Sequence, residues 1–195
     1  MLVDSSATSV TNSLSPDILS FGNINSIIES AVSSSPWLST QEKFNQVNNV
    51  VILGHGGNLA VADHIGADIT RLTKYSKQTF VPGSAIVCTS LINDTSFDDW
   101  MKNWFASLNS ILKPDNTLVI GISSSGRSKD IARAFDYCLE QGYVTSLITA
   151  KKSTLIKSTY EVVTNCSSYH TSEIVALALG YQLVHATGFI CPEIK

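Results

Sequence analysis

Val50-Val51-Ile52-Leu53-Gly54-His55-Gly56-Gly57-Asn58 carries a β-branched apolar run directly into a glycine-rich turn. A second run, Thr117-Leu118-Val119-Ile120, leads in the same way towards the turn Ser123-Ser124-Ser125-Gly126-Arg127-Ser128. Short apolar runs of this kind suit fully buried parallel strands, and a helical pattern follows each turn. Ligands of parallel sheets bind beyond the carboxyl ends of the strands. We therefore expect both turns to lie at one ligand-binding edge.

The composition of the two turns indicates an anion as the ligand. Glycine lets backbone N–H groups approach an anion closely, and the N-terminus of the following helix adds positive partial charge. The second turn also offers more hydroxyl groups than a helix cap requires, from Ser123, Ser124, Ser125 and Ser128. The turns alone are also compatible with ordinary strand-to-helix connections. The serines favour an anion site, and a sugar phosphate fits it.

The pattern along the chain alternates strands with helices, which predicts an α/β fold with a parallel sheet. We expect strands at 50–54, 84–88, 117–122, 143–149 and 158–164. We expect helices at 57–72, 97–112, 128–141 and 171–188, preceded by lead-in helices at 24–32 and, from a capping box at 39–42, up to residue 47. Residues 1–20 are predicted to be a loose tail, and residues 21–195 a single domain.

Composition excludes several classes of protein. The chain has 195 residues, 44% of them hydrophobic and 15% charged, with a net charge of −3 and no basic cluster, so we expect no nucleic-acid partner. The start shows no targeting signal, and the apolar stretch 174–191 is expected to be a buried helix rather than a membrane span. The four cysteines form no CxxC pair and are expected to be reduced thiols of a cytoplasmic protein. Leu59 breaks the GxGxxG pattern of a dinucleotide site.

The chain resembles the SIS-domain sugar isomerases, and among them most the phosphoheptose (sedoheptulose 7-phosphate) isomerases. Residues 54–64 match the family pattern GNGGS-x5-H, and residues 122–128 match its phosphate loop S-[ST]-S-G-x-S. The resemblance implies a three-layer αβα sandwich with a five-stranded parallel, flavodoxin-like sheet. It also implies aldose–ketose isomerisation of a sugar phosphate in a homotetramer with active sites at subunit interfaces.

The resemblance assigns roles to individual residues. His64 and Asp68, which stand at i and i+4 on one helix face, match catalytic residues that also hold a metal. Zinc is the metal that the resemblance implies for such a pair. Because the chain departs from the family at Asp68 and Gly180, we expect weak or no zinc binding, and no other cofactor is predicted. The residues expected to bind substrate or phosphate are His55, Gly56, Gly57, Asn58, Asn93, Asp94, Ser123, Ser124, Ser125 and Ser128.

The chain departs from the family in its acid/base groups. Asp68 replaces a longer glutamate, and Gly180 stands where the family has a catalytic histidine in its last helix. His170 is a candidate substitute, whereas His185 lies more than one helical turn further on. Two functions stay open: a sugar-phosphate isomerase with a rearranged set of bases, and a catalytically weakened SIS protein that binds phosphosugars or a protein partner.

Overall fold

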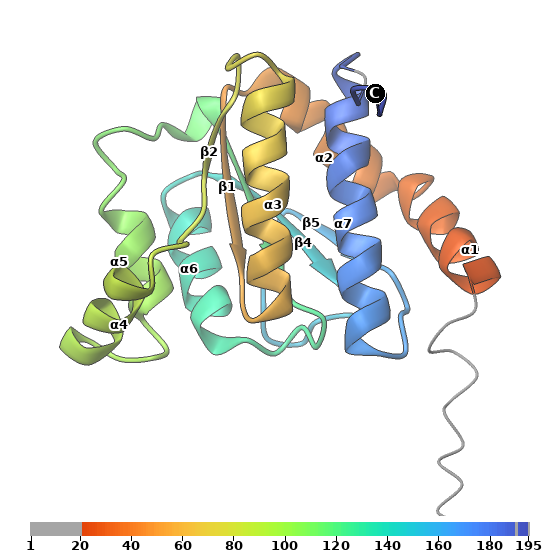
Figure 1. Ribbon diagram of the computed structural model, residues 1–195. Helices are drawn as coiled ribbons and strands as arrows, with labels where there is room; N and C mark the ends of the chain where they lie inside the picture. Colours follow the sequence, from red (N-terminus) through yellow and green to blue (C-terminus); the bar gives the residue numbers. More distant parts are fainter. Residues whose placement is uncertain (1–20, 190, 195) are drawn as a thin grey trace, which may run out of the picture.

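Five parallel strands form the middle layer of the computed structural model, which describes residues 21–189 and 191–194 (Figure 1). The strands are β1 (Asn49–Gly54), β2 (Gln78–Phe80), β3 (Thr117–Ile122), β4 (Val144–Thr149) and β5 (Tyr160–Val163). Their order is β2-β1-β3-β4-β5, and every neighbouring pair is parallel. The predicted α/β class with its five-stranded parallel sheet is confirmed. The predicted tail, residues 1–20, lies outside the described residues.

Helices cover both faces of the sheet because successive strand residues point to opposite sides. In β1, Val50 and Ile52 join the core beneath one helical layer, whereas Val51 and Leu53 join the core beneath the other. The first layer consists of α1 (Phe21–Val32), α2 (Ser35–Gln46), α3 (Gly57–Leu72) and α7 (Tyr169–Ala186). The second consists of α4 (Ala85–Asp94), α5 (Trp100–Ala106) and α6 (Lys129–Glu140). A 3-10 turn, Pro114–Asn116, precedes β3. The molecule is a three-layer αβα sandwich.

The predicted strand at 84–88 is wrong, because these residues begin helix α4. Ser84 caps this helix, its hydroxyl accepting a hydrogen bond from the backbone N–H of Val87. The strand that occupies this place in the sheet is β2, three residues long and paired with β1 from Asn49 opposite Gln78. A capping serine after Pro82 and Gly83 starts a helix here despite the β-branched residues that follow.

Other predicted boundaries differ less. Helix α2 begins at Ser35, earlier than predicted, because Ser34 is its N-cap and Pro36 lies in its first turn. The capping box predicted at 39–42 therefore lies inside the helix. The helix predicted over 97–112 is limited to α5, and turns follow it.

The structure bears on two further predictions from composition. In the described part of the chain, no helix is both long and apolar enough to cross a membrane. All four cysteines are free thiols, at positions 88, 138, 166 and 191.

A buried lysine ties the end of α2 to the segment before β2. The ammonium group of Lys77 donates hydrogen bonds of 2.6 Å to the carbonyl oxygens of Phe44 and Val47, and the residue is only 6% exposed. The two carbonyls come from the C-terminal end of α2, where backbone oxygens lack helical partners. Burial lowers the pKa of Lys77 below its usual value.

We expect Lys77→Met to lower the free energy of unfolding by about 1–3 kcal/mol, because two buried carbonyls lose their donor. Since the folded protein releases the Lys77 proton at a lower pH than the unfolded chain, the unfolded chain binds more protons between the two pKa values. The free energy of unfolding should therefore rise as the pH approaches 10.5, and this rise should be absent in the Lys77→Met variant. Urea unfolding from pH 7 to 10.5 measures both effects. The exposed Lys157→Met is the control, and equal stability of the two variants would contradict the prediction.

Candidate functional site

The pairing of β1 with β3 places the two predicted turns side by side. Gly54, the last residue of β1, is in register with Ile122, the last residue of β3. Both turns therefore begin at the same level, at the carboxyl edge of the sheet. A hydrogen bond of 3.1 Å from the Asn58 side-chain amide to the Ser124 hydroxyl joins them directly. Both of these residues are buried.

The first turn depends on glycine at two positions. Gly56, the N-cap of α3, has φ +52° and ψ −123°, a conformation that side chains disfavour. At Gly54 a Cβ atom would lie 2.7 Å from the carbonyl oxygen of Asn58, so the turn closes back on the strand. The glycines therefore serve the sharp entry into α3.

The second turn is anchored to β4 and presents hydroxyl groups at the start of α6. The backbone N–H of Ser123 donates to Ile148, and the carbonyl of Ser124 accepts from the N–H of Ala150. Ser128 is the N-cap of α6, yet its hydroxyl makes no capping bond and lies 3.0 Å from the hydroxyl of Ser123. Two hydroxyls and the uncapped first turn of a helix thus converge, which is an arrangement suited to an anion.

Both turns line one cavity of about 300 Å³. Eight of the residues predicted to bind substrate or phosphate line it: His55, Gly56, Gly57, Asn58, Ser123, Ser124, Ser125 and Ser128. The start of α7 adds Tyr169, His170 and Glu173. Of these three, His170 is the candidate substitute acid/base group that the sequence predicts. The Glu173 carboxylate lies directly over Gly57, where a Cβ atom would overlap it.

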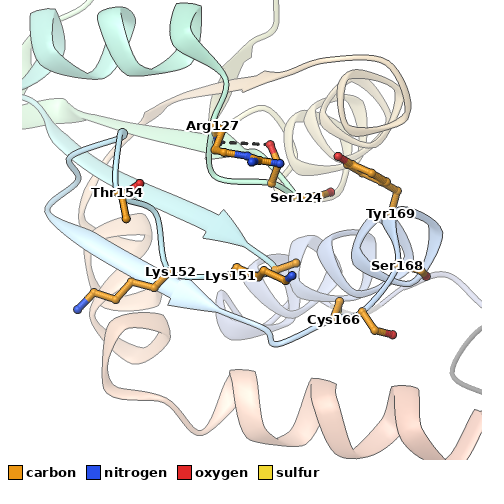
Figure 2. A pocket seen from close by; sticks show the side chains of 11 residues that line it. Ser124, Arg127, Lys151, Lys152, Thr154, Cys166, Ser168 and Tyr169 are labelled. Carbon is orange, nitrogen blue, oxygen red and sulfur yellow. Dashed lines mark hydrogen bonds between the residues drawn. The ribbon is translucent and has the colours of Figure 1, made fainter.

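A second cavity, of about 320 Å³, adjoins the first and shares Ser124, Ser125 and Tyr169 with it. Figure 2 shows Arg127 and Lys151 on different sides of this cavity and Tyr169 beside it. Its lining includes three cations, from Arg127, Lys151 and Lys152, and no carboxylate. The serine-rich turn therefore stands beside a basic surface that favours negatively charged ligands.

His55 contacts a buried carboxylate that sequence reasoning missed. Its Nε2 atom lies 2.5 Å from Oδ2 of Asp130, which is completely buried in the first turn of α6. The same oxygen accepts a hydrogen bond of 3.0 Å from the indole N–H of Trp100. The two groups are in ion-pair contact, but Nε2 makes no hydrogen bond to a described residue. An acidic residue in the first helical turn is so common that its sequence carries no signal of this role.

The predicted pair His64 and Asp68 lies further along α3 and does not line the cavity between the turns. The His64 ring nitrogen Nε2 is 2.7 Å from the hydroxyl of Tyr181 and 3.6 Å from the Asp68 carboxylate. Arg71 donates to Asp68 at 2.7 Å. Both side chains therefore already have partners, and their catalytic role stays a prediction.

Asn93 and Asp94 are at the C-terminal end of α4, where the Asn93 amide donates to Asp94 at 3.1 Å. They do not line the cavity either. Their contact with a sugar stays a prediction.

The side chains around His64 do not fit a zinc site. Among the described residues, no three or more His, Cys, Asp and Glu side chains gather where they could hold a metal. Gly180, which takes the place of an expected third ligand, faces Ile65 so closely that even a Cβ atom would overlap that side chain. We therefore derive no chemical step through a metal.

Comparison with known sequences finds phosphoheptose isomerases, although no family model matches the chain. The chain is 28% identical over 116 residues to the phosphoheptose isomerase of Thermodesulfovibrio yellowstonii, covering 57% of this chain and 55% of that protein. It is 26% identical over 137 residues to that of Pelobacter propionicus, covering 68% of this chain and 70% of that protein. Thus the match with the first of these relatives spans little more than half of its length.

Solved structures agree on the fold. A phosphoheptose isomerase from Neisseria gonorrhoeae superposes with a TM-score of 0.73 at 16% identity, over 86% of this chain and 94% of that one. This chain resembles the phosphoheptose isomerases and has their SIS-domain fold. The sugar isomerase domain of an RpiR transcription factor from Sphaerobacter thermophilus shares the fold as well, with a TM-score of 0.56 over 86% of this chain and 87% of that one, at 16% identity.

We expect Gly180→Ala to destabilise the protein by about 1–3 kcal/mol through overpacking against Ile65. The direction of this change in stability is informative, because a glycine-to-alanine change in an ordinary helix interior stabilises the helix by about 1 kcal/mol. Ile65→Val should relieve part of the clash, so the double variant should be less destabilised than the two single effects predict together. Urea unfolding measures all three variants. A stabilised Gly180→Ala protein would show that α3 and α7 are less closely packed.

Proposed function

We propose that this chain is a phosphosugar isomerase of the phosphoheptose isomerase type, which interconverts a ketose phosphate such as sedoheptulose 7-phosphate with its aldose isomer. The observation that carries the proposal is the single cavity in which the serine-rich start of α6 meets the glycine turn of α3. The similarity to phosphoheptose isomerases supports the class of substrate.

The phosphate group would bind at the start of α6. There the hydroxyls of Ser123 and Ser128 already face each other at 3.0 Å, so either can turn its proton towards an anion. The helix N-terminus adds favourable partial charge, and Arg127 and Lys151 in the adjoining cavity attract the dianion.

The sugar end would then lie towards the first turn and the start of α7. His55, His170 and Glu173 line that part of the cavity and are able to exchange protons. Asn58 and the backbone of the glycine turn provide hydrogen bonds to hydroxyl groups. Isomerisation requires a base that moves a proton between neighbouring carbons and donors that stabilise the enediolate oxygens, and these residues are of the right types.

A specific observation favours the second candidate function, phosphosugar binding without turnover. His64 and Asp68 bind Tyr181 and Arg71, and Gly180 is packed against Ile65. A protein in which these groups no longer act as catalysts would keep the serine-rich turn as a phosphate-binding site. Such a protein would respond to a phosphosugar or present it to a partner protein.

We propose that the protein is a cytoplasmic homo-oligomer, a tetramer by its resemblance to the isomerases. Helix α4 has no fully buried residue, and its Ile86 is 81% exposed. Phe97, in the following turn, is 57% exposed. A second copy that covers these side chains would remove apolar surface from water. Light scattering after gel filtration measures the mass, and a monomer at micromolar concentration would contradict this assembly.

We expect Ser128→Ala to weaken the binding of sedoheptulose 7-phosphate by about tenfold or more, because one hydrogen bond to the charged phosphate is lost. The fold should be unaffected, since the Ser128 hydroxyl caps nothing. Isothermal titration calorimetry measures the affinity. Ser90→Ala on the exposed surface of α4 is the matched control and should bind as the unaltered protein does. Equal affinity of both variants would place the phosphate elsewhere.

Incubation with sedoheptulose 7-phosphate, followed by NMR, distinguishes the two functions. Formation of the aldose heptose 7-phosphate supports the isomerase. Saturable binding without product supports the phosphosugar-binding protein. The absence of both binding and product would contradict both proposals for this sugar.

A further inference from the structure

The two ring nitrogens of His55 lie in different surroundings. Nε2 is buried and faces the Asp130 carboxylate at 2.5 Å. Nδ1 makes no hydrogen bond to any described residue, and the side chain, 32% exposed, lines the cavity between the two turns. Because Nε2 is buried against the carboxylate, Nδ1 is the nitrogen that remains to take a proton from a ligand.

The carboxylate of Asp130 lacks full compensation for its burial. It accepts the Trp100 indole N–H through Oδ2, whereas Oδ1 is buried without a hydrogen-bond partner. A completely buried carboxylate is costly unless a positive charge or sufficient donors are near. The first turn of α6 supplies part of this stabilisation, and an imidazolium at His55 would supply the rest. A positive charge that forms on the His55 ring during proton transfer would therefore face the Asp130 carboxylate.

Aromatic rings hold the imidazole from the α5 side. Phe97 stacks on His55 with ring centroids 5.6 Å apart, and Trp100 does so at 6.1 Å. Their interplanar angles of 28° and 30° are close to parallel, so the two rings limit tilting of the imidazole. Aromatic faces also stabilise a cation. The two rings therefore both orient the imidazole and favour a positive charge on it.

We propose that His55, positioned by Asp130, is the acid/base group that moves the proton during isomerisation. The proposal rests on the proposed function. In the direction from ketose to aldose, Nδ1 takes a proton from C1, whose electron pair forms the C1–C2 double bond as the C2 carbonyl becomes an enediolate oxygen. The imidazolium then returns the proton to C2, while the hydroxyl proton on O1 is transferred to O2 and C1 becomes the carbonyl. No atom is gained or lost, C1 is oxidised and C2 is reduced by two electrons.

The other titratable groups near the cavity are less suited to this step. The Glu173 carboxylate lies over Gly57 at the start of α3, and no described side chain orients it through a hydrogen bond or ion pair. His170 is exposed and has no carboxylate within ion-pair distance among the described residues. Asp68 is bound by Arg71 outside the cavity. Among the described titratable residues that line the cavity, His55 alone contacts a buried carboxylate.

The first test measures proton transfer itself, as the incorporation of solvent deuterium into sedoheptulose 7-phosphate by NMR. His55→Asn should lower the rate by about 100-fold or more, the usual contribution of a general base, and should leave phosphosugar affinity within a few-fold. Asp130→Asn keeps the side-chain volume and should lower kcat by at least about tenfold with little change in KM, because an amide can stabilise the wrong ring tautomer. His185→Asn, at the exposed end of α7, is the matched histidine control.

The second test uses NMR to observe which nitrogen of the His55 ring carries a proton. In protein with ¹⁵N-labelled histidine, the signals absent from His55→Asn belong to His55. We expect them to show a proton on Nε2 and none on Nδ1, to shift with sedoheptulose 7-phosphate, and to change tautomer in Asp130→Asn. This readout does not depend on turnover.

The outcomes separate the failure of the two proposals. If the unaltered protein incorporates deuterium and His55→Asn does so equally fast, the assignment of His55 is wrong while the isomerase function stands. Loss of exchange in Glu173→Gln or Asp68→Asn, with exchange retained in His55→Asn, would identify the actual base. If the unaltered protein binds the sugar phosphate without exchange, both the isomerase function and this role of His55 are overturned. His55 signals unaffected by bound sugar would also overturn its role.

Discussion

The parallel pairing of β1 with β3 is the constraint on which the site depends. Because Gly54 is level with Ile122, the chain leaves both strands at one edge and enters two helices whose N-termini are neighbours. The Asn58–Ser124 hydrogen bond then joins turns that are far apart in sequence. A shift in the register of either strand would separate the serine hydroxyls from the glycine turn and leave Asn58 buried without its partner.

The sequence was sufficient to predict the elements in which local and global signals agree. β1, β3 and their following helices combine apolar runs, glycine turns and long helical patterns, and all of them fold close to the predicted bounds. Residues 84–88 show where this reasoning fails. Their β-branched composition favours a strand, but Ser84 caps them as a helix, and the real edge strand, Gln78–Phe80, is too short to show a pattern. Pairing with β1, which is a tertiary contact, decides where the strand lies.

The site was predictable to the extent that it consists of backbone turns. The residues of the two turns could be identified from the sequence, because the roles of glycine and serine in a strand-to-helix turn depend on the local backbone geometry. The contact between His55 and Asp130 could not, because it joins the end of one strand to the start of a helix after another strand, and each residue has an ordinary local role. Likewise, only the packing of α7 on α3 reveals that position 180 has no room for a side chain.

The two faces of the sheet differ in the groups that they place near the serine-rich turn. On the α3 and α7 side, Gly180 packs closely against Ile65, and His64 is bonded to Tyr181. On the α5 and α6 side, His55 faces a buried carboxylate and two aromatic rings. The serine-rich turn lies at the carboxyl edge of the sheet, between these two layers. Under the proposed function, a sugar phosphate anchored at the start of α6 would therefore meet its base from the α5 and α6 layer rather than from the α3 and α7 layer.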